Sequence, residues 1–110
     1  LTMIYQGEII GRDACDGMLK ILLKQQLNDR LARFLPPGTP VAHKTGTLPG
    51  IRNDAGIIYV ADNAHVAVTV FSRWDDQAAD TAQLSRQRMY EIDTTFGLIG
   101  RAIYDHYLKT

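Results

Sequence analysis

Apolar residues recur at helical spacing through the first third of the chain. The segment from residue 13 to residue 23 places one apolar stripe on a helix that the side chain of Asp13 can cap, and this stripe consists of Met18, Leu19, Leu22 and Leu23. Leu27, Leu31 and Phe34 continue the spacing and predict a second short helix after a break near Asn28-Asp29. Proline cannot continue a helical hydrogen-bond ladder, so the proline-rich run 36–40 ends this helical part.

A second helical stripe lies at the end of the chain, where residues 90–107 predict a closing helix. Its apolar positions are Ile92, Phe96, Ile99, Ile103 and Tyr107. Gly97 and Gly100 lie within it, and we expect them to let the helix approach a sheet closely. The preceding run 74–88 is polar and predicts a surface excursion.

Between the helical parts, three apolar runs are bounded by turn residues and predict strands: 41–45, 55–61 and 65–71. The turns at 48–50 and 62–63 are short, which favours antiparallel pairing. The last two runs are apolar at nearly every position, so we expect both faces of the sheet to be covered. The predicted fold class is α+β, with a three-stranded antiparallel sheet flanked by helices.

Composition narrows the possible functions. The chain has 110 residues, enough for one domain, and its 12 basic and 12 acidic side chains cancel, so no general attraction to nucleic acid or anionic membrane is expected. No apolar run approaches the length of a membrane span. Cys15 is the only cysteine, so no internal disulfide can form; the side chain is predicted to be either small and buried or inert and exposed.

The first residues predict that the chain is a section of something longer. Residues 1–7 resemble the last turns of a helix that stops at Gly7, without a signal-peptide pattern. We therefore expect residues 1–110 to form a C-terminal section of a domain. It would contain a helical part over 1–38, strands over about 41–71, a surface excursion over 72–89 and a closing helix over about 90–108.

The chemistry of the chain concentrates in residues 43–47, which read His-Lys-Thr-Gly-Thr on a strand that leads into a turn. Alternation along a strand puts Lys44 and Gly46 on one face and His43, Thr45 and Thr47 on the other. Gly46 lets a ligand lie against the backbone, and a free Thr47 N–H at the sheet edge could donate to a developing oxyanion. These groups suit an anionic substrate with a carbonyl under attack.

A Lys-Thr-Gly triplet at a sheet edge is one of three motifs of serine β-lactamases and penicillin-binding proteins, the others being Ser-x-x-Lys and Ser-Asp-Asn. The other two are missing here, because the only serines, Ser72 and Ser85, are followed three places on by Asp75 and Arg88. The run therefore resembles part of an active site without its nucleophile. Ser72 as an alternative nucleophile has no histidine or lysine near it in sequence.

The resemblance extends over most of the chain. The matching runs, in the family's order, are Gln25-Gln26-Leu27-Asn28-Asp29-Arg30, Phe34-Leu35-Pro36, residues 43–50, Arg52-Asn53-Asp54-Ala55-Gly56-Ile57-Ile58 and, in the closing helix, Leu98-Ile99-Gly100-Arg101-Ala102-Ile103-Tyr104. Together they resemble the C-terminal part of a class A β-lactamase or a close penicillin-recognising relative.

This resemblance implies a serine β-lactamase-type hydrolase that opens the lactam ring through an acyl-serine intermediate. Lys44 and Thr45 would bind the substrate carboxylate and support the catalytic hydrogen-bond network, with Gly46 beside them. The Thr47 amide would form half of the oxyanion hole. The serine, its lysine, the Ser-Asp-Asn loop and the glutamate for deacylation would precede Leu1, so the isolated chain is expected to be inactive.

One departure concerns the arginine that many class A enzymes direct at the substrate carboxylate from the next strand. The nearest arginine here is Arg52, beside the connecting turn. Its guanidinium can hold a substrate carboxylate bidentately, or it can pair with Asp54. This departure leaves open a penicillin-recognising esterase or D-alanyl peptidase relative.

Some of these residues also have purely structural interpretations. Lys44 can be an edge-strand lysine that discourages aggregation, and His43 is expected to pack on the opposite side. No metal-ligand spacing links His43, His65 and His106, and no cofactor is implied.

The expected partners follow from the resemblance. They are a β-lactam or related acyl substrate and the missing N-terminal half of the fold, with no nucleic acid and no membrane. The family is normally exported, which implies a periplasmic or secreted parent protein. A non-catalytic alternative is a piece that self-associates through exposed Ile57, Tyr59, Val66 or Val68.

Overall fold

The computed structural model describes residues 1–75 and 82–109. Helices α1 (Thr2–Gln6) and α2 (Arg12–Leu23) come first. Strands β1 (Val41–Leu48), β2 (Ile51–Ala61) and β3 (Ala64–Arg73) follow, and α3 (Ala82–Leu108) closes the chain. The sheet is antiparallel in the order β1-β2-β3, which confirms the predicted fold class.

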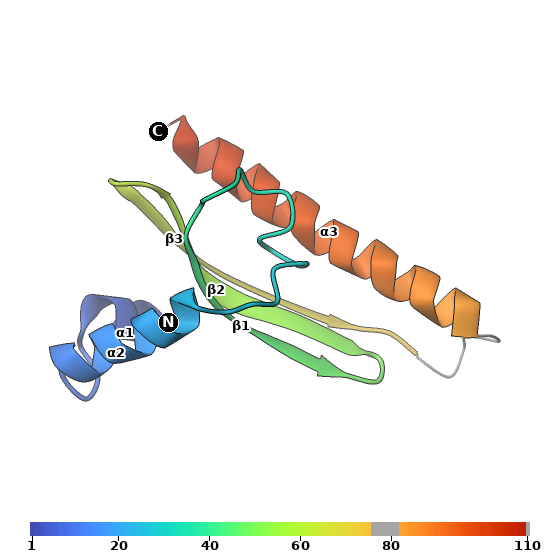
Figure 1. Ribbon diagram of the computed structural model, residues 1–110, viewed down its shortest axis with the longest axis horizontal. Helices are drawn as coiled ribbons and strands as arrows, with labels where there is room; N and C mark the ends of the chain where they lie inside the picture. Colours follow the sequence, from blue (N-terminus) through green and yellow to red (C-terminus); the bar gives the residue numbers. More distant parts are fainter. Residues whose placement is uncertain (76–81, 110) are drawn as a thin grey trace.

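The helical elements lie on opposite sides of the sheet (Figure 1). Helix α3 runs along one side, while α1 and α2 lie on the other, where α2 contacts β1. The connection between α2 and β1, residues 24–40, passes between the sheet and α3, and we call it the turn segment. We call the side beneath α3 the covered face and the other side the open face. No helix within the described ranges is both long and apolar enough to cross a membrane.

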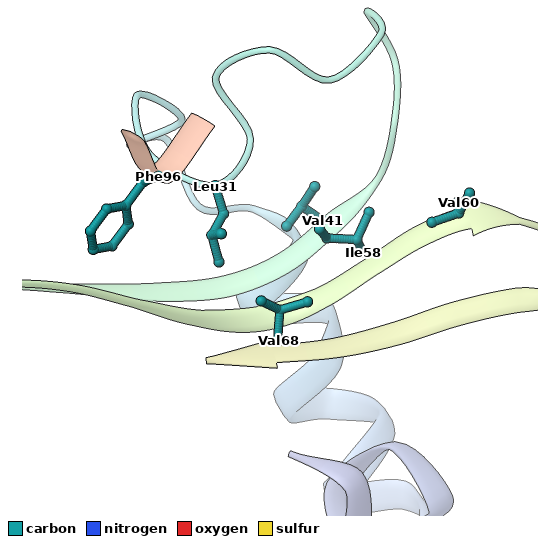
Figure 2. Close-up of a cluster of buried hydrophobic side chains, with 6 residues drawn as sticks. All are labelled: Leu31, Val41, Ile58, Val60, Val68 and Phe96. Atoms are coloured by element: carbon teal, nitrogen blue, oxygen red, sulfur yellow. The ribbon is translucent and has the colours of Figure 1, made fainter. Parts of the chain in front are cut away.

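The core lies on the covered face (Figure 2), where aliphatic side chains from the sheet and the turn segment meet Phe96 of α3. Its buried members are Leu31, Val41, Ile58, Val60, Val68 and Phe96. Ile92, Ile99 and Ile103 pack against it as the stripe predicts, but Tyr107 is 41% exposed and Tyr104 packs there instead. The apolar stripe of α3 therefore ends with Tyr104 in place of the predicted Tyr107.

Several predicted boundaries in the first part were wrong. Gly11, not Asp13, precedes the first residue of α2, and Asp13 lies in its first turn. Instead of a second helix, residues 29–30 form a bend and 31–34 a turn, held by bonds such as Arg33 N–H to the Arg30 carbonyl at 3.0 Å. Their apolar side chains follow helical spacing, but the backbone is drawn to the sheet by bonds from Leu31 and Arg30.

The predicted surface excursion was also partly wrong, because α3 begins at Ala82, eight residues before the expected start at Tyr90. Its residues 76–81 lie outside the described part of the chain. The first eight residues of α3 are mostly polar and exposed, so they show no apolar periodicity, which explains why the pattern missed them.

Gly97 and Gly100 do permit a close approach, but to the turn segment and not to the sheet. A Cβ on Gly100 would lie 2.1 Å from the Leu31 carbonyl oxygen, and one on Gly97 would lie 2.6 Å from the Phe34 ring. The glycines thus dock α3 on residues 31–34, which in turn lie over the sheet.

The open face is less covered than the apolar runs predicted. Along β3, inward Val66, Val68 and Val70 alternate with exposed residues, among them Phe71, which is 74% exposed. Ile57 and Val68 are buried, and Tyr59 and Val66 are half-buried, so the expected self-association surface is not formed by these four side chains. Cys15 is buried, which selects the first of its two predicted states.

Candidate functional site

The backbone of β1 presents two amides at the open edge of the sheet. Tyr59 N–H donates to the Pro40 carbonyl at 3.0 Å, and the β1–β2 register continues unbroken to Leu48 opposite Ile51. Hydrogen-bonded pairs alternate with non-bonded pairs in an antiparallel ladder, so Gly46 is bonded to β2. The N–H groups of Thr45 and Thr47 therefore point away from β2, toward an edge that no strand of the described chain covers.

Lys44 lies on the open face and is exposed. Its ammonium donates to the carbonyl oxygen of Thr45, so it folds back along the edge to which that carbonyl points. The Thr45 side chain lies on the covered face and is 5% exposed. The structure thus brings the Lys44 ammonium to the edge that carries the Thr47 amide, while the Thr45 side chain points elsewhere.

Gly46 has room above its α-carbon. A Cβ added there would meet no atom closer than Asn53 Cβ, at 3.7 Å, which is ordinary van der Waals distance. Internal packing therefore does not require glycine at this position. A residue without a side chain here leaves the strand backbone accessible from the open face.

Sequence reasoning assigned no role to Arg30, which the structure places directly behind the Lys-Thr-Gly strand. Its Nη1 donates to the carbonyl oxygens of Gly46 at 3.0 Å and Asn53 at 2.9 Å, and its Nη2 donates to Thr47 Oγ1. Arg30 is 3% exposed. An arginine inside the apolar series Leu27, Leu31 and Phe34 was the available signal, but spacing could not reveal partners 16 and 23 residues away.

Arg52 does not pair with Asp54, which corrects one of its two predicted partners. Its Nη1 donates to both carboxylate oxygens of Asp93 on α3, at 3.2 and 3.3 Å. Asp93 Oδ1 also lies 3.6 Å from Arg30 Nε. The Arg52 guanidinium points into the covered face. Asp93 is far from Arg52 in the sequence, and no local pattern links the two residues.

This cluster carries more positive than negative charge. Two guanidiniums, Arg30 and Arg52, share the carboxylate of Asp93, and the Nε atoms of both arginines make no hydrogen bond within the described residues, although Arg30 Nε is within ion-pair distance of Asp93. Burial raises the pKa of Asp93, and the neighbouring Arg52 opposes that rise. An excess of positive charge one hydrogen bond behind Thr47 favours an anion near the edge.

His43 is buried on the face opposite Lys44, as predicted, at 1% exposure. Among the described residues, no group of three or more His, Cys, Asp or Glu side chains could hold a metal ion. Ser72 lies on β3, two strands from Lys44, and its hydroxyl donates to the Arg52 carbonyl. It is used structurally, and nothing places it near the candidate edge.

The chain matches the model of the Beta-lactamase enzyme family over residues 1–107. It resembles the TLA-3 extended-spectrum β-lactamase structure with 27% identity and a TM-score of 0.74, covering 98% of this chain and 38% of that one. A class A β-lactamase from Bacteroides cellulosilyticus is similar in fold, with 22% identity, a TM-score of 0.76 and coverage of 100% and 39%.

A third solved structure, PBP-A, is 29% identical with a TM-score of 0.57, covering 86% of this chain and 36% of that one. No curated protein sequence matches. The chain therefore spans less than two fifths of the length of these three structures.

Proposed function

Since the chain belongs to the β-lactamase enzyme family, we propose that the protein carrying it is a serine β-lactamase of the class A type, with this chain as its C-terminal section. Its edge from Lys44 to Thr47 would form one wall of the active site. The observation that carries the proposal is the outward Thr47 amide beside the Lys44 ammonium, on a strand that Arg30 holds from behind.

The proposed reaction begins outside this chain, at a serine hydroxyl from the rest of the fold. The serine hydroxyl gives up its proton as its oxygen attacks the lactam carbonyl, the carbonyl carbon–nitrogen bond breaks, and the ring nitrogen takes up a proton in exchange. Water then attacks the acyl-serine ester, releasing the opened acid and restoring the hydroxyl. The isolated chain supplies no such hydroxyl at the edge, so it is proposed to be inactive.

This chain would contribute three groups to that reaction. The Thr47 N–H would donate to the carbonyl oxygen as negative charge develops on it. Such stabilisation of the oxyanion is usually the largest single contribution to the rate of acyl transfer. The Lys44 ammonium would attract the substrate carboxylate, and the open space over Gly46 would admit the substrate against the backbone. Arg30 would add positive potential from behind Thr47. To bind the substrate carboxylate, Arg52 would first have to break its ion pair with Asp93. We therefore propose that Arg52 contributes only to the positive charge behind β1.

A pair of substitutions at Thr47 in the full-length protein tests the amide directly. Thr47→Pro removes the N–H, which points away from β2, and so costs no ladder bond to that strand. Thr47→Ala keeps the N–H and removes only the hydroxyl that accepts from Arg30. We expect Thr47→Pro to lower kcat for penicillin hydrolysis about 100-fold and Thr47→Ala to lower it much less. Equal losses in two folded variants would contradict the assigned role of the amide.

A D-alanyl esterase or peptidase activity is the second candidate, favoured by the likeness to PBP-A. The ratio of kcat/KM for a penicillin to kcat/KM for a D-Ala-D-Ala ester, measured on the full-length protein, separates the two. A ratio well above one supports the lactamase, and a ratio well below one supports the peptidase relative. Export to the periplasm or medium is part of the proposal, and cell fractionation tests it.

A further inference from the structure

A chain of buried hydrogen bonds lies on the covered face just behind the candidate edge. His43 Nδ1 lies 2.9 Å from Asp54 Oδ1, and His43 Nε2 lies 3.0 Å from Asn28 Oδ1. The other oxygen of Asp54 accepts from Leu31 N–H at 3.2 Å, and Asp54 is fully buried. None of these groups takes part in the reaction proposed above.

The hydrogen-bond partners determine which atoms of the imidazole carry protons. An ionised carboxylate has no proton to donate, so Asp54 Oδ1 must be the acceptor and His43 Nδ1 the donor of their bond. The orientation of the Asn28 amide is set separately, because its Nδ2 donates to the Gln25 carbonyl at 3.2 Å, which leaves Oδ1 facing His43. Both ring nitrogens of His43 therefore face acceptors, and both bonds form only if the ring donates from each nitrogen.

The fold reserves space for this ring. Gly56 lies opposite His43 in the β1–β2 register. A Cβ on Gly56 would lie 2.4 Å from His43 Cβ and 2.5 Å from the Ala42 carbonyl oxygen, closer than any real contact. The glycine on β2 therefore accommodates His43 at this place, and the imidazole is part of the packing and not an incidental surface group.

The same bonds fasten residues 28–31 to the sheet at both ends. Asn28 is tied through His43, and Leu31 is tied through its backbone to Asp54. Arg30 lies between these two attachments, and its guanidinium contacts Gly46 and Thr47. Where Arg30 points thus depends on the position of a segment that His43 and Asp54 hold.

From this geometry we infer that Asn28, His43 and Asp54 form a clamp in which a doubly protonated His43 bridges the turn segment and the sheet. Asp54 and His43 act as positioning residues for the active-site edge, through Arg30 and Thr47. The positioning role rests on the proposed lactamase function, whereas the protonation of His43 and the attachment of residues 28–31 do not.

The first test reads the ring protons without any assay of activity. In the full-length protein labelled with ¹⁵N-histidine, long-range ¹H–¹⁵N spectra at neutral pH report each ring nitrogen, with His43→Gln identifying the signals. We expect both His43 nitrogens to show protonated shifts. One unprotonated His43 nitrogen in the folded protein would overturn the clamp.

The second test uses variants at the exposed end of the clamp, where folding is least at risk. Asn28→Ala removes the acceptor for His43 Nε2, and Asn28→Asp restores an acceptor. Because misplacement of a group by about 1 Å can cost about 100-fold in rate, we expect Asn28→Ala to lower kcat about tenfold with little change in KM. Asn28→Asp should recover most of that loss, which a merely structural role would not predict.

Asp54→Asn challenges the buried end with an isosteric group. Its amide offers one acceptor where His43 and Leu31 N–H require two, so one buried donor loses its partner. We expect the variant to show faster hydrogen exchange at the Leu31 amide and a loss in kcat at least as large as that of Asn28→Ala. Asp62→Asn, in the exposed β2–β3 turn, is the matched control and should change neither.

The outcomes distinguish the clamp from the proposed function. If the wild-type protein opens no lactam, the proposed function fails. The clamp is then judged by the His43 nitrogens and by shifts of the Gly46 and Thr47 amides in Asn28→Ala. If the wild-type protein is active and the clamp variants keep full kcat, the positioning role is overturned. Unchanged Gly46 and Thr47 amide shifts in Asn28→Ala would overturn it equally.

Discussion

The face of the sheet beneath α3 holds its charged groups buried and bonded, whereas the open face presents Lys44 to solvent. On the covered face, Arg30, Asp54 and Asp93 are each at most 7% exposed and have partners on other elements. On the open face, within residues 1–75 and 82–109, the ammonium of Lys44 bonds only to its neighbour's carbonyl oxygen, and Leu48 and Phe71 are 63% and 74% exposed.

This difference separates support from reaction. Buried charges with several bonds cannot move without leaving a desolvated partner behind, so they fix the backbone of β1 in place. A group that must meet a substrate has to remain accessible, and Lys44 and the Thr47 amide lie where they can do so. One strand thus serves both purposes, because its side chains and backbone groups alternate in direction.

The largest expected effect comes from breaking the covered face at its closest contact. Gly100→Ala puts a Cβ against the Leu31 carbonyl, and relieving this clash would require the backbone of α3 or of the turn segment to move. We expect the free energy of unfolding of the full-length protein, measured in urea, to fall by about 3 kcal/mol. Gly17→Ala is the matched control, because a Cβ there meets nothing within 4 Å and alanine favours a helix. Equal stability of the two variants would contradict the packing of α3 described above.

Lys44→Ala tests the open face with the opposite signature. The side chain is exposed, so we expect the free energy of unfolding to change by no more than about 0.5 kcal/mol. The value of kcat/KM for penicillin should fall about 100-fold, which corresponds to about 2.7 kcal/mol of transition-state stabilisation. A Lys44→Ala enzyme with wild-type kcat/KM would leave only the edge-strand interpretation of this lysine.

Asp93 offers a pH test of the covered face. Burial raises its pKa above the ordinary 3.8, so the folded protein keeps this proton to a higher pH than the unfolded chain does. The contribution of Asp93 to stability is therefore greatest below pH 3.8 and is lost as the pH rises through the raised pKa. Asp93→Asn should remove this part of the slope in unfolding free energy against pH. A slope identical to that of the wild type would show that Asp93 does not titrate as described.

The smallest effect is expected where α1 meets the open face. Tyr5 Oη and His65 Nδ1 share a hydrogen bond of 2.7 Å between exposed side chains. Because water replaces such a bond readily, Tyr5→Phe should lower the free energy of unfolding by about 0.5 kcal/mol, measured by urea unfolding. A loss several times larger would mean that the open face is held as firmly as the covered one.

The pattern of the sequence predicted the three strands, their antiparallel pairing and the apolar face of α3, since these depend on local periodicity. It missed the first eight residues of α3, because an exposed and mostly polar stretch of helix has no apolar period to detect. Residues 27–34 were predicted as a helix because their apolar spacing is helical, although bonds to distant strands decide their backbone.

The same division holds for the candidate site. The Lys-Thr-Gly motif was visible because its members are adjacent in sequence. The structural roles of Arg30, Asp54 and Asp93 were not predicted, since their partners lie 11 to 63 residues away and only the fold brings them together. Arg52 was expected at the substrate or at Asp54, and its actual partner on α3 follows from helix docking that no local pattern encodes.

The most direct test of the central claim is intact-protein mass spectrometry of the full-length protein mixed with a penicillin, followed by peptide mapping of any adduct. We expect one covalent adduct of the mass of the lactam, on a serine outside residues 1–110, and much slower formation of that adduct in folded Lys44→Ala. No adduct and no hydrolysis by the folded wild-type protein would contradict the account. So would an adduct on Ser72 or Ser85.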